Sequence, residues 1–368
     1  MFDIVIMSLF SACLSLMNIG IGASMMLPAV KISNPAGLGS PACDVPWTNC
    51  DDDESLPAVA LGDTGPFHIV YCTDTNDWDL LAASIQSLIR HFSMPDKAIV
   101  TLMVPEEEHT LVNAVVDELR ACLIHEFGAR GSALTVRVHP VSNISLAHLQ
   151  SLTSLDGWPT AALYRLLLPE LLPNRHRVLY LDTDVIVNGD LVPLLQVKMN
   201  HSVGVVPSSY DRYWTLFHPH DFADVTGYQY QCPDYADLSS HGFRIDVETF
   251  FNSGVMLLDL ERWRAENLMR LVTEIGGSDL IHWCFADQLA MNLAFGDGSV
   301  DVLDWRWNAH ALNSEICQSM PKQCRDQVRI AHLNGGDKCT SKNSVCRDIG
   351  KFWQPAPRKC IAKWLNRE

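Results

Sequence analysis

The sequence predicts an α/β fold, with a mainly parallel central sheet flanked by helices and an N-terminal membrane segment. In residues 67–340, short apolar runs suited to buried strands alternate with helical patterns, which is typical of a parallel sheet covered on both faces. The 368 residues provide for two domains or for one large domain with insertions. No residue between Asp3 and Lys31 is charged, and that stretch exceeds the roughly 20 residues needed to cross a bilayer.

The uncharged stretch leaves two alternatives for residues 1–31, a signal anchor or a cleaved signal peptide. Small residues between Gly20 and Ser24 offer a cleavage site. The segment before the stretch contains Asp3 but no Lys or Arg, so the positive-inside rule does not orient it. Either alternative sends the chain into the secretory pathway. We expect a Golgi membrane protein with a luminal folded domain or, alternatively, a secreted protein.

Composition supports the secretory pathway. Residues 32–65 are rich in Pro, Gly and Asp and are expected to form a stem or linker, because they bury too little apolar area to fold. Asn143 and Asn200 begin N-glycosylation sequons. The chain has 12 cysteines, which indicates disulfides in an oxidising compartment, although their pairing stays open. Residues 341–368 are a cysteine-bearing tail that we expect to pack on the domain.

The first part of the chain has apolar runs of strand length between segments whose apolar residues recur at helical spacing. In order, these are a strand at Phe67–Thr73, a helix at Trp78–Phe92, a strand at Ile99–Val104, a helix at Leu111–Phe127 and a strand at Leu134–Val138. In the first of these helices, Leu81, Ile85 and Leu88 share the face expected to be buried.

The second part continues the alternation around one irregular region. Its elements are a helix at Thr160–Leu172, an apolar run at Arg177–Val187, a strand at Phe250–Leu258, helices at Asp259–Ile275 and Ala286–Phe295 and a strand at Val328–Leu333. Residues 208–248 show little periodicity, and a stretch of that length inside a domain is usually a functional loop region.

The net charge of −16 argues against a nucleic-acid partner, because phosphate binding needs clustered Lys and Arg.

Asp182 and Asp184 follow an apolar run, and residues two apart in an extended chain project to the same side. Two close carboxylates avoid mutual repulsion when they share a divalent cation. The same Asp-Thr-Asp-Val string also fits a haloacid dehalogenase-type phosphatase, with Asp182 as nucleophile and Asp184 as general acid. That motif normally lies on a domain's first strand, whereas three strand-and-helix units precede it here.

Five segments in order carry a family resemblance. They are Ile69–Asn76, Thr160–Leu195, Phe251–Trp263, the run Asp287-Gln288 with Asn292 and the following Trp305–Asn308, and His332–Lys338. Together they resemble glycosyltransferase family 8, the glycogenin and bacterial galactosyltransferase group. The resemblance implies a GT-A type nucleotide-sugar-binding fold, with residues 66–340 as the catalytic domain. It also implies retaining transfer of a hexose or related sugar from a UDP-sugar to a glycan or glycoprotein.

The resemblance also implies the site residues. Asp182, Asp184 and His332 would bind Mn²⁺, with Mg²⁺ as the alternative, since a mixed set of carboxylates and imidazole suits Mn²⁺ better. Lys338 would contact the diphosphate and Gly335 would let the backbone approach it. The implied donor-binding side chains are Asp74, Asn76, Arg165, Thr183 and Asn252. The implied catalytic side chains, which line the sugar, are Arg165, Asn252, Asp287 and Gln288.

The implied mechanism is attack from the face of the leaving group. Gln288 is a neutral amide and therefore a weak nucleophile, so we expect no covalent intermediate. Two positions depart from the family pattern: Leu289 stands where many members have a second Asp, and Cys339-Thr340 follows Lys338 where many have Pro-Trp. A catalytically inactive luminal protein that binds a nucleotide sugar stays as a third hypothesis.

Overall fold

The computed structural model describes residues 66–142, 160–217, 219, 232–281, 284–285, 287–309 and 322–333. All of them belong to one compact unit, Pro41–Glu368. No helix among them is long and apolar enough to cross a membrane. The expected N-terminal membrane segment, the stem, the C-terminal tail, Gly335 and Lys338 lie outside the described residues.

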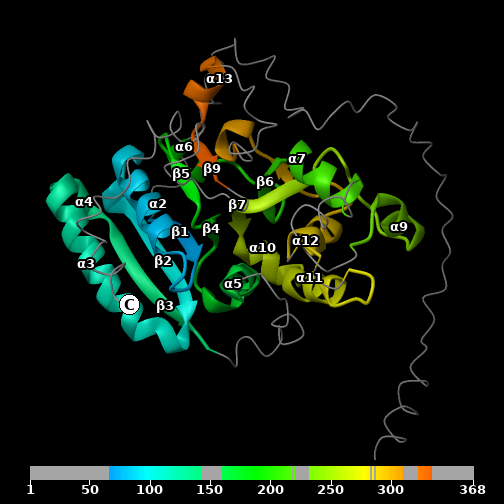
Figure 1. Ribbon diagram of the computed structural model, residues 1–368, viewed down its shortest axis with the longest axis horizontal. Helices are drawn as coiled ribbons and strands as arrows, with labels where there is room; N and C mark the ends of the chain where they lie inside the picture. Colours follow the sequence, from blue (N-terminus) through cyan, green and yellow to red (C-terminus); the bar gives the residue numbers. More distant parts are fainter. Residues whose placement is uncertain are drawn as a thin grey trace, which may run out of the picture. The chain divides into compact units, whose positions relative to one another are not determined.

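A seven-stranded sheet, in the order β3-β2-β1-β4-β7-β6-β8, organises this unit (Figure 1). Its strands are β1 (Phe67–Cys72), β2 (Ala98–Pro105), β3 (Thr135–Val141), β4 (Arg177–Leu181), β6 (Val203–Pro207), β7 (Phe251–Asp259) and β8 (Asp301–Val302). Neighbouring strands are parallel except that β7 runs antiparallel to both β4 and β6. The mainly parallel sheet is therefore confirmed, with one reversed strand, β7, in its interior.

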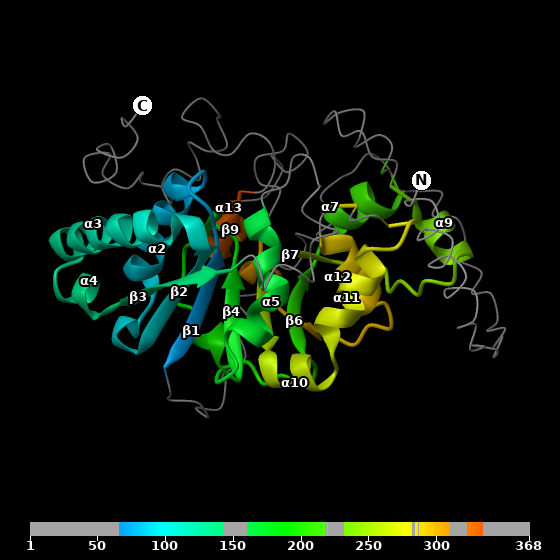
Figure 2. The same cartoon turned by 90° about the horizontal axis from the view of Figure 1, so that it is seen from below.

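Alternate residues of the strands supply the cores on the two faces of the sheet. In β1, Ile69 and Tyr71 belong to one apolar cluster, whereas Val70 belongs to the other. The first cluster is covered by α2 (Trp78–His91) and α3 (His109–Phe127). The second is covered by α5 (Tyr164–Leu171), α10 (Leu260–Ala265), α11 (Leu268–Gly276) and α12 (Gln288–Ala294). Figure 2 shows the two groups of helices beside different parts of the sheet.

The apolar run Arg177–Val187 forms two strands in two different sheets. β4 ends at Leu181, the chain turns through Asp182–Asp184, and β5 (Val185–Val187) pairs antiparallel with β9 (Ile330–His332). The Asp182 N–H donates to Gly254 O at 2.8 Å, so the turn is anchored to β7. The two aspartates are thus brought together by a turn between sheets and not by the alternation of one extended strand.

One expected helix is divided in the structure, and two strands had not been expected. The predicted helix Asp259–Ile275 is broken into α10 and α11, because Asn267 between them adopts a left-handed backbone with φ of 53°. The strands β6 and β8 were not expected. The irregular region contains α7 (Ser209–Arg212), a π-helical turn (Tyr213–Phe217), α9 (Tyr235–Ser240) and further residues outside the described ranges.

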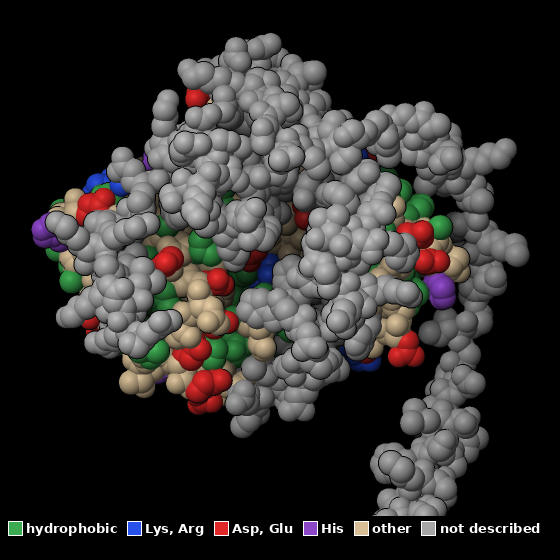
Figure 3. Space-filling model, in the orientation of Figure 1, with side chains coloured by type: hydrophobic (Ala, Val, Ile, Leu, Met, Phe, Trp, Pro, Cys, Tyr) green, Lys and Arg blue, Asp and Glu red, His purple; other side chains and the backbone are tan. Residues whose placement is uncertain are grey.

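A disulfide joins Cys232 in this region to Cys284, which lies shortly before α12. The bond ties two segments that are 52 residues apart in sequence, so the disulfides do not only close short loops. On the face of the molecule shown in Figure 3, Asp and Glu side chains are scattered over the described surface, in keeping with the net charge of −16.

Candidate active site

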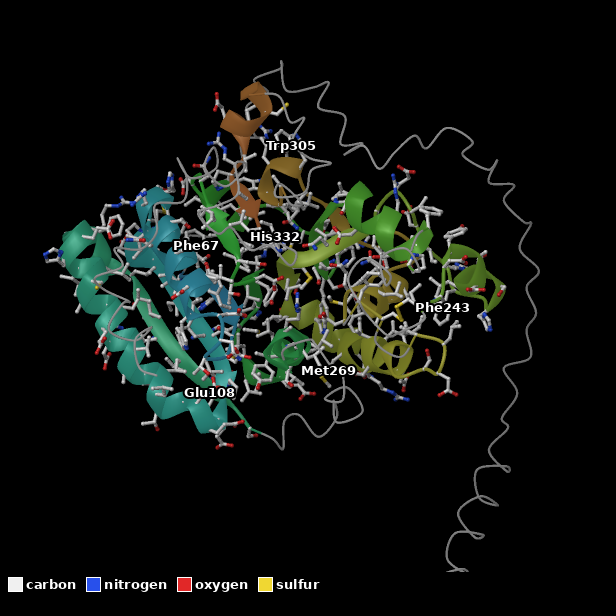
Figure 4. The ribbon with its side chains drawn as sticks, viewed as in Figure 1. Phe67, Glu108, Phe243, Met269, Trp305 and His332 are labelled. Carbon is white, nitrogen blue, oxygen red and sulfur yellow. A yellow bond between two sulfur atoms is a disulfide. The ribbon has the colours of Figure 1, made fainter. Side chains whose placement is uncertain are left out.

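Asp182, Asp184 and His332 converge where the two sheets meet. The β5–β9 pairing sets Val185 opposite His332, which draws the end of β9 to the turn after β4. His332 Nε2 lies 3.1 Å from Asp184 Oδ1 and 3.7 Å from Asp182 Oδ2. One candidate ligand atom from each of the three residues lies within 4.8 Å of the others. In Figure 4, His332 is labelled near the middle of the unit.

The two oxygens of Asp182 have different surroundings. Oδ1 accepts a hydrogen bond from the Tyr180 hydroxyl at 2.5 Å and lies 3.3 Å from Arg165 Nη1. Oδ2 instead faces His332. Burial raises the pKa of Tyr180 well above its usual range, so the hydroxyl stays protonated and able to donate. The carboxylate is therefore held through one oxygen while the other points into the cluster.

Arg165 is a buried cation between two carboxylates. Its side chain is in contact with Asp182 on one side, and its Nε lies 3.1 Å from Asp287 Oδ2 on the other. Nη1 also donates to Ser253 O and Oγ at 3.0 and 3.1 Å, and the guanidinium lies 4.8 Å from the centre of the Tyr180 ring. Burial alone would lower the pKa of Arg165, but the two carboxylates raise it above its usual range. Its charge is permanent, and it offsets the cost of burying Asp287 and of partly burying Asp182.

The pKa values of His332 and Asp287 are both shifted by burial and by neighbouring charges. Burial lowers the pKa of His332, but Asp184 and Asp182 outweigh that effect and raise it above the usual value. Burial raises the pKa of Asp287 to about 6; Arg165 opposes this rise, and the Asp182 charge adds to it. Strongly shifted groups clustered in this way are typical of functional sites.

Amide side chains link β7 to the start of α12. Asn252 Nδ2 donates to Gln288 Oε1 at 3.1 Å and to Asp211 Oδ1 at 3.3 Å, and Gln288 Nε2 donates to Asp211 Oδ1 at 3.1 Å. Asn292 fixes the helix to the strand, because it donates to Phe251 O and accepts from Phe251 N–H, both at 2.9 Å. Asp287 and Gln288 are thus placed by the packing of α12 on β7.

The expected nucleotide-contacting residues lie in the loop after β1. Asp74 Oδ1 accepts from the Asn76 N–H at 2.8 Å, which closes a local turn. The Glu108 carboxylate accepts from both the N–H and the hydroxyl of Thr75, at 2.9 and 3.1 Å. Because β1 and β4 are parallel neighbours, this loop and Asp182 lie at the same edge of the sheet. In Figure 4, Glu108 is labelled at the end of the unit near α3.

The structure brings together most of the residues that sequence reasoning singled out. Asp182, Asp184 and His332 form one cluster, which continues through Arg165 to Asp287 and through Ser253 to Gln288. Thr183 is buried in the turn between the two aspartates. Leu289 is fully buried in a separate apolar cluster with Leu216 and Cys284, so this departure from the family pattern adds a core residue.

Four residues of the site were not singled out: Glu108, Asp211, Gly254 and Asn308. A Cβ added to Gly254 would stand 2.1 Å from His332 Cε1 and 2.7 Å from Asp182 Oδ2, so only glycine fits there. Gly254 and Asn308 lie inside segments that carried the family resemblance, which was the available signal. Asp211 and Glu108 had no signal, because their partners are distant in sequence.

The chain has clear relatives. Residues 68–339 match the family described as Glycosyl transferase family 8. The chain is 26% identical over 283 residues to "Probable galacturonosyltransferase-like 7" of Arabidopsis thaliana, covering 73% of this chain and 70% of that protein.

Solved structures support the fold. The apo structure of the bifunctional glycosyltransferase WbbM matches with a TM-score of 0.60 at 18% identity; the match covers 83% of this chain and 52%, about half, of the other. The galactosyltransferase LgtC, in complex with donor and acceptor sugar analogs, matches with a TM-score of 0.54 at 22% identity, over 79% of this chain and 95% of the other. Both likenesses support the GT-A type architecture of the described sheet and helices.

Proposed function

Because the chain belongs to glycosyl transferase family 8, we propose that it is a retaining enzyme that transfers a hexose or related sugar from a UDP-sugar to a glycan or glycoprotein acceptor. The observation that carries the proposal is the convergence of Asp182, Asp184 and His332 beside the buried Arg165–Asp287 pair. Two strands of different sheets and a turn bring the cluster together. A solvated pair of strand-end aspartates would not need such an arrangement.

The donor set fits a divalent cation. Asp182 Oδ2, Asp184 Oδ1 and His332 Nε2 face one another, and the two carboxylates repel each other unless a positive charge lies between them. We propose Mn²⁺, with Mg²⁺ as the alternative, because Mn²⁺ accepts imidazole together with carboxylate oxygens. When bound, the cation would stabilise the negative charge on the departing diphosphate.

The chain's own residues favour attack from the leaving-group face. Gln288 Oε1 already accepts from Asn252 Nδ2 and from the Ser253 N–H at 3.2 Å, so the amide oxygen is tied down. Asp287 is buried and lies against Arg165, which holds its carboxylate. Neither group is disposed to form a bond to the sugar. An oxygen of the leaving diphosphate then accepts the proton of the acceptor hydroxyl.

The remaining donor contacts follow the family pattern. Asp74 and Asn76 are proposed to hold the nucleoside, Thr183 to line the nucleotide side of the metal cluster, and Gly335 and Lys338 to contact the diphosphate. Arg165 and Asn252 are both buried and each makes several hydrogen bonds, which supports a role in fixing the sugar site's shape. The acceptor is proposed to meet residues 208–248.

We place the protein in the secretory pathway, in the Golgi membrane with a luminal catalytic domain. The Cys232–Cys284 disulfide supports an oxidising compartment. The sequon residue Asn200 is exposed in the loop before β6, where an oligosaccharide has room.

The test is a donor screen with the purified full chain, reading UDP release for each UDP-sugar with Mn²⁺ and after addition of a chelator. We expect release that depends on the metal and is abolished by Asp184→Ala, with unchanged thermal unfolding. Asp117→Ala, an exposed carboxylate on α3, is the matched control. Full activity in Asp184→Ala would overturn the proposal. Hydrolysis of a phosphate ester without UDP release would favour the phosphatase alternative, and nucleotide-sugar binding without release would favour the inactive binder.

A further inference from the structure

A chain of buried amides leads to the side of His332 that faces away from the two aspartates. Asn308 Oδ1 lies 3.1 Å from His332 Nδ1. Asn308 Nδ2 donates to Asn252 Oδ1 at 3.3 Å, and the Gly254 N–H donates to the same oxygen at 2.9 Å. Asn252, Asn308 and His332 are only 6%, 2% and 1% exposed, so water has little access to replace any of these bonds.

The orientation of each amide is determined by groups that cannot change role. A backbone N–H only donates, so the Asn252 atom that meets Gly254 N is the oxygen. The Asp211 carboxylate accepts, so the Asn252 atom that faces it is the nitrogen. Asn252 Oδ1 then requires a donor from Asn308, which turns the Asn308 oxygen towards His332.

We propose that Asn308, oriented by Asn252, is a positioning residue that holds the His332 imidazole with Nδ1 as the N–H, so that Nε2 presents its lone pair to a cation held by Asp182 and Asp184. The inference rests on the proposed function in one respect, since it takes the Asp-Asp-His cluster as the cation site. It goes beyond that function because it states that Asn252 and Asn308 determine which ring nitrogen of His332 carries the proton.

The physical consequence concerns affinity for the cation. A metal ligand must present a lone pair, and a histidine held by an acceptor at its other nitrogen presents it without first losing rotational freedom. Removing such a partner typically costs 10- to 100-fold in metal affinity. Because Asn252 Nδ2 also bonds Gln288 and Asp211, the same amide connects the histidine to the start of α12.

The first test measures Mn²⁺ affinity of the full chain without nucleotide, from the electron paramagnetic resonance signal of free Mn²⁺. Asn308→Leu keeps the approximate volume but removes the acceptor, and it should weaken binding at least about tenfold. Asn308→Asp keeps an oxygen to accept from Nδ1–H and should bind within about threefold of the wild type, or more tightly. Equal losses in both variants, or no loss in Asn308→Leu, would overturn the proposal.

The second test needs no variant and covers the case in which Asn308→Leu does not fold. The imidazole ¹⁵N spectrum of the wild type loaded with diamagnetic Mg²⁺ should show a proton on Nδ1 of His332 and none on Nε2. The opposite tautomer would overturn the proposal. If His332 carries its proton on Nδ1 and the protein binds the metal but turns over no UDP-sugar, the proposed function alone is refuted. If the wild type binds neither Mn²⁺ nor Mg²⁺, the proposed metal dependence and this inference both fail.

Discussion

Gly254 and His332 are packed so closely that a Cβ on the glycine would stand 2.1 Å from the ring carbon Cε1. Gly254 lies in the reversed strand β7, and its carbonyl accepts the Asp182 N–H at 2.8 Å. One residue of β7 therefore determines both where the first aspartate sits and how close the histidine can come.

Gly254→Ala should displace His332 or Asp182 and lower sugar transfer at least about 100-fold, with a loss of about 1–3 kcal/mol in the free energy of unfolding from overpacking. UDP release and urea unfolding measure the two effects. Gly204→Ala is the matched control, because its Cβ would lie 3.4 Å from the Leu303 side chain and 3.5 Å from Leu257 Cβ, which are ordinary contacts. Unchanged turnover in Gly254→Ala would mean that sugar transfer does not depend on the position of the His332 imidazole.

Arg165→Met should destabilise the fold by about 3–5 kcal/mol, because Asp287 would be left buried, and Asp182 half-buried, without their cation. Adding Asp287→Asn should recover part of that loss, which a double-mutant cycle from urea unfolding would reveal. Arg270→Met removes an exposed pair with Glu274 and should leave the free energy of unfolding close to that of the wild type. A loss under about 1 kcal/mol in Arg165→Met would contradict the charge balance described for this site.

Asp287 should make stability fall as the pH rises towards neutrality. Its pKa is raised from 3.8 to about 6 in the folded protein, chiefly by burial, so the folded state binds the proton more tightly than the unfolded state does. The free energy of unfolding therefore decreases between about pH 4 and pH 6 and is level above that, by about 3 kcal/mol in all. The difference between wild type and Asp287→Asn, from urea unfolding at successive pH values, should follow this slope. A difference independent of pH would show that the carboxyl titrates normally.

Glu108→Ala should lower UDP affinity about tenfold, equivalent to about 1.4 kcal/mol, because two hydrogen bonds that hold the Asp74–Asn76 loop are lost. Isothermal titration calorimetry with UDP and Mn²⁺ gives the affinity directly. Glu106→Ala, an exposed neighbour in the same turn, should bind UDP like the wild type. Equal affinity in both variants would remove Glu108 from the nucleotide site.

Local pattern alone was sufficient for much of the architecture. Leu81, Ile85 and Leu88 repeat at helical spacing, and all three are fully buried on the face of α2 that covers the sheet. The alternation of strands and helices likewise predicted the parallel half of the sheet. These features depend on neighbours within a few residues, so the sequence displays them directly.

The site was only partly predictable, because its residues are brought together by strand pairings between distant segments, and local sequence patterns do not indicate such pairings. Asp182 and Asp184 were found from their spacing, and His332 from a family resemblance, but the spacing does not reveal the turn between two sheets. The reversed direction of β7 and the β5–β9 pairing decided that Gly254 borders the histidine and that Asn308 lies behind it. The sequence by itself determined the fold class and the residue types of the cluster. Only the tertiary structure decided which atom of each residue faces the others, because that depends on contacts between segments far apart in the chain.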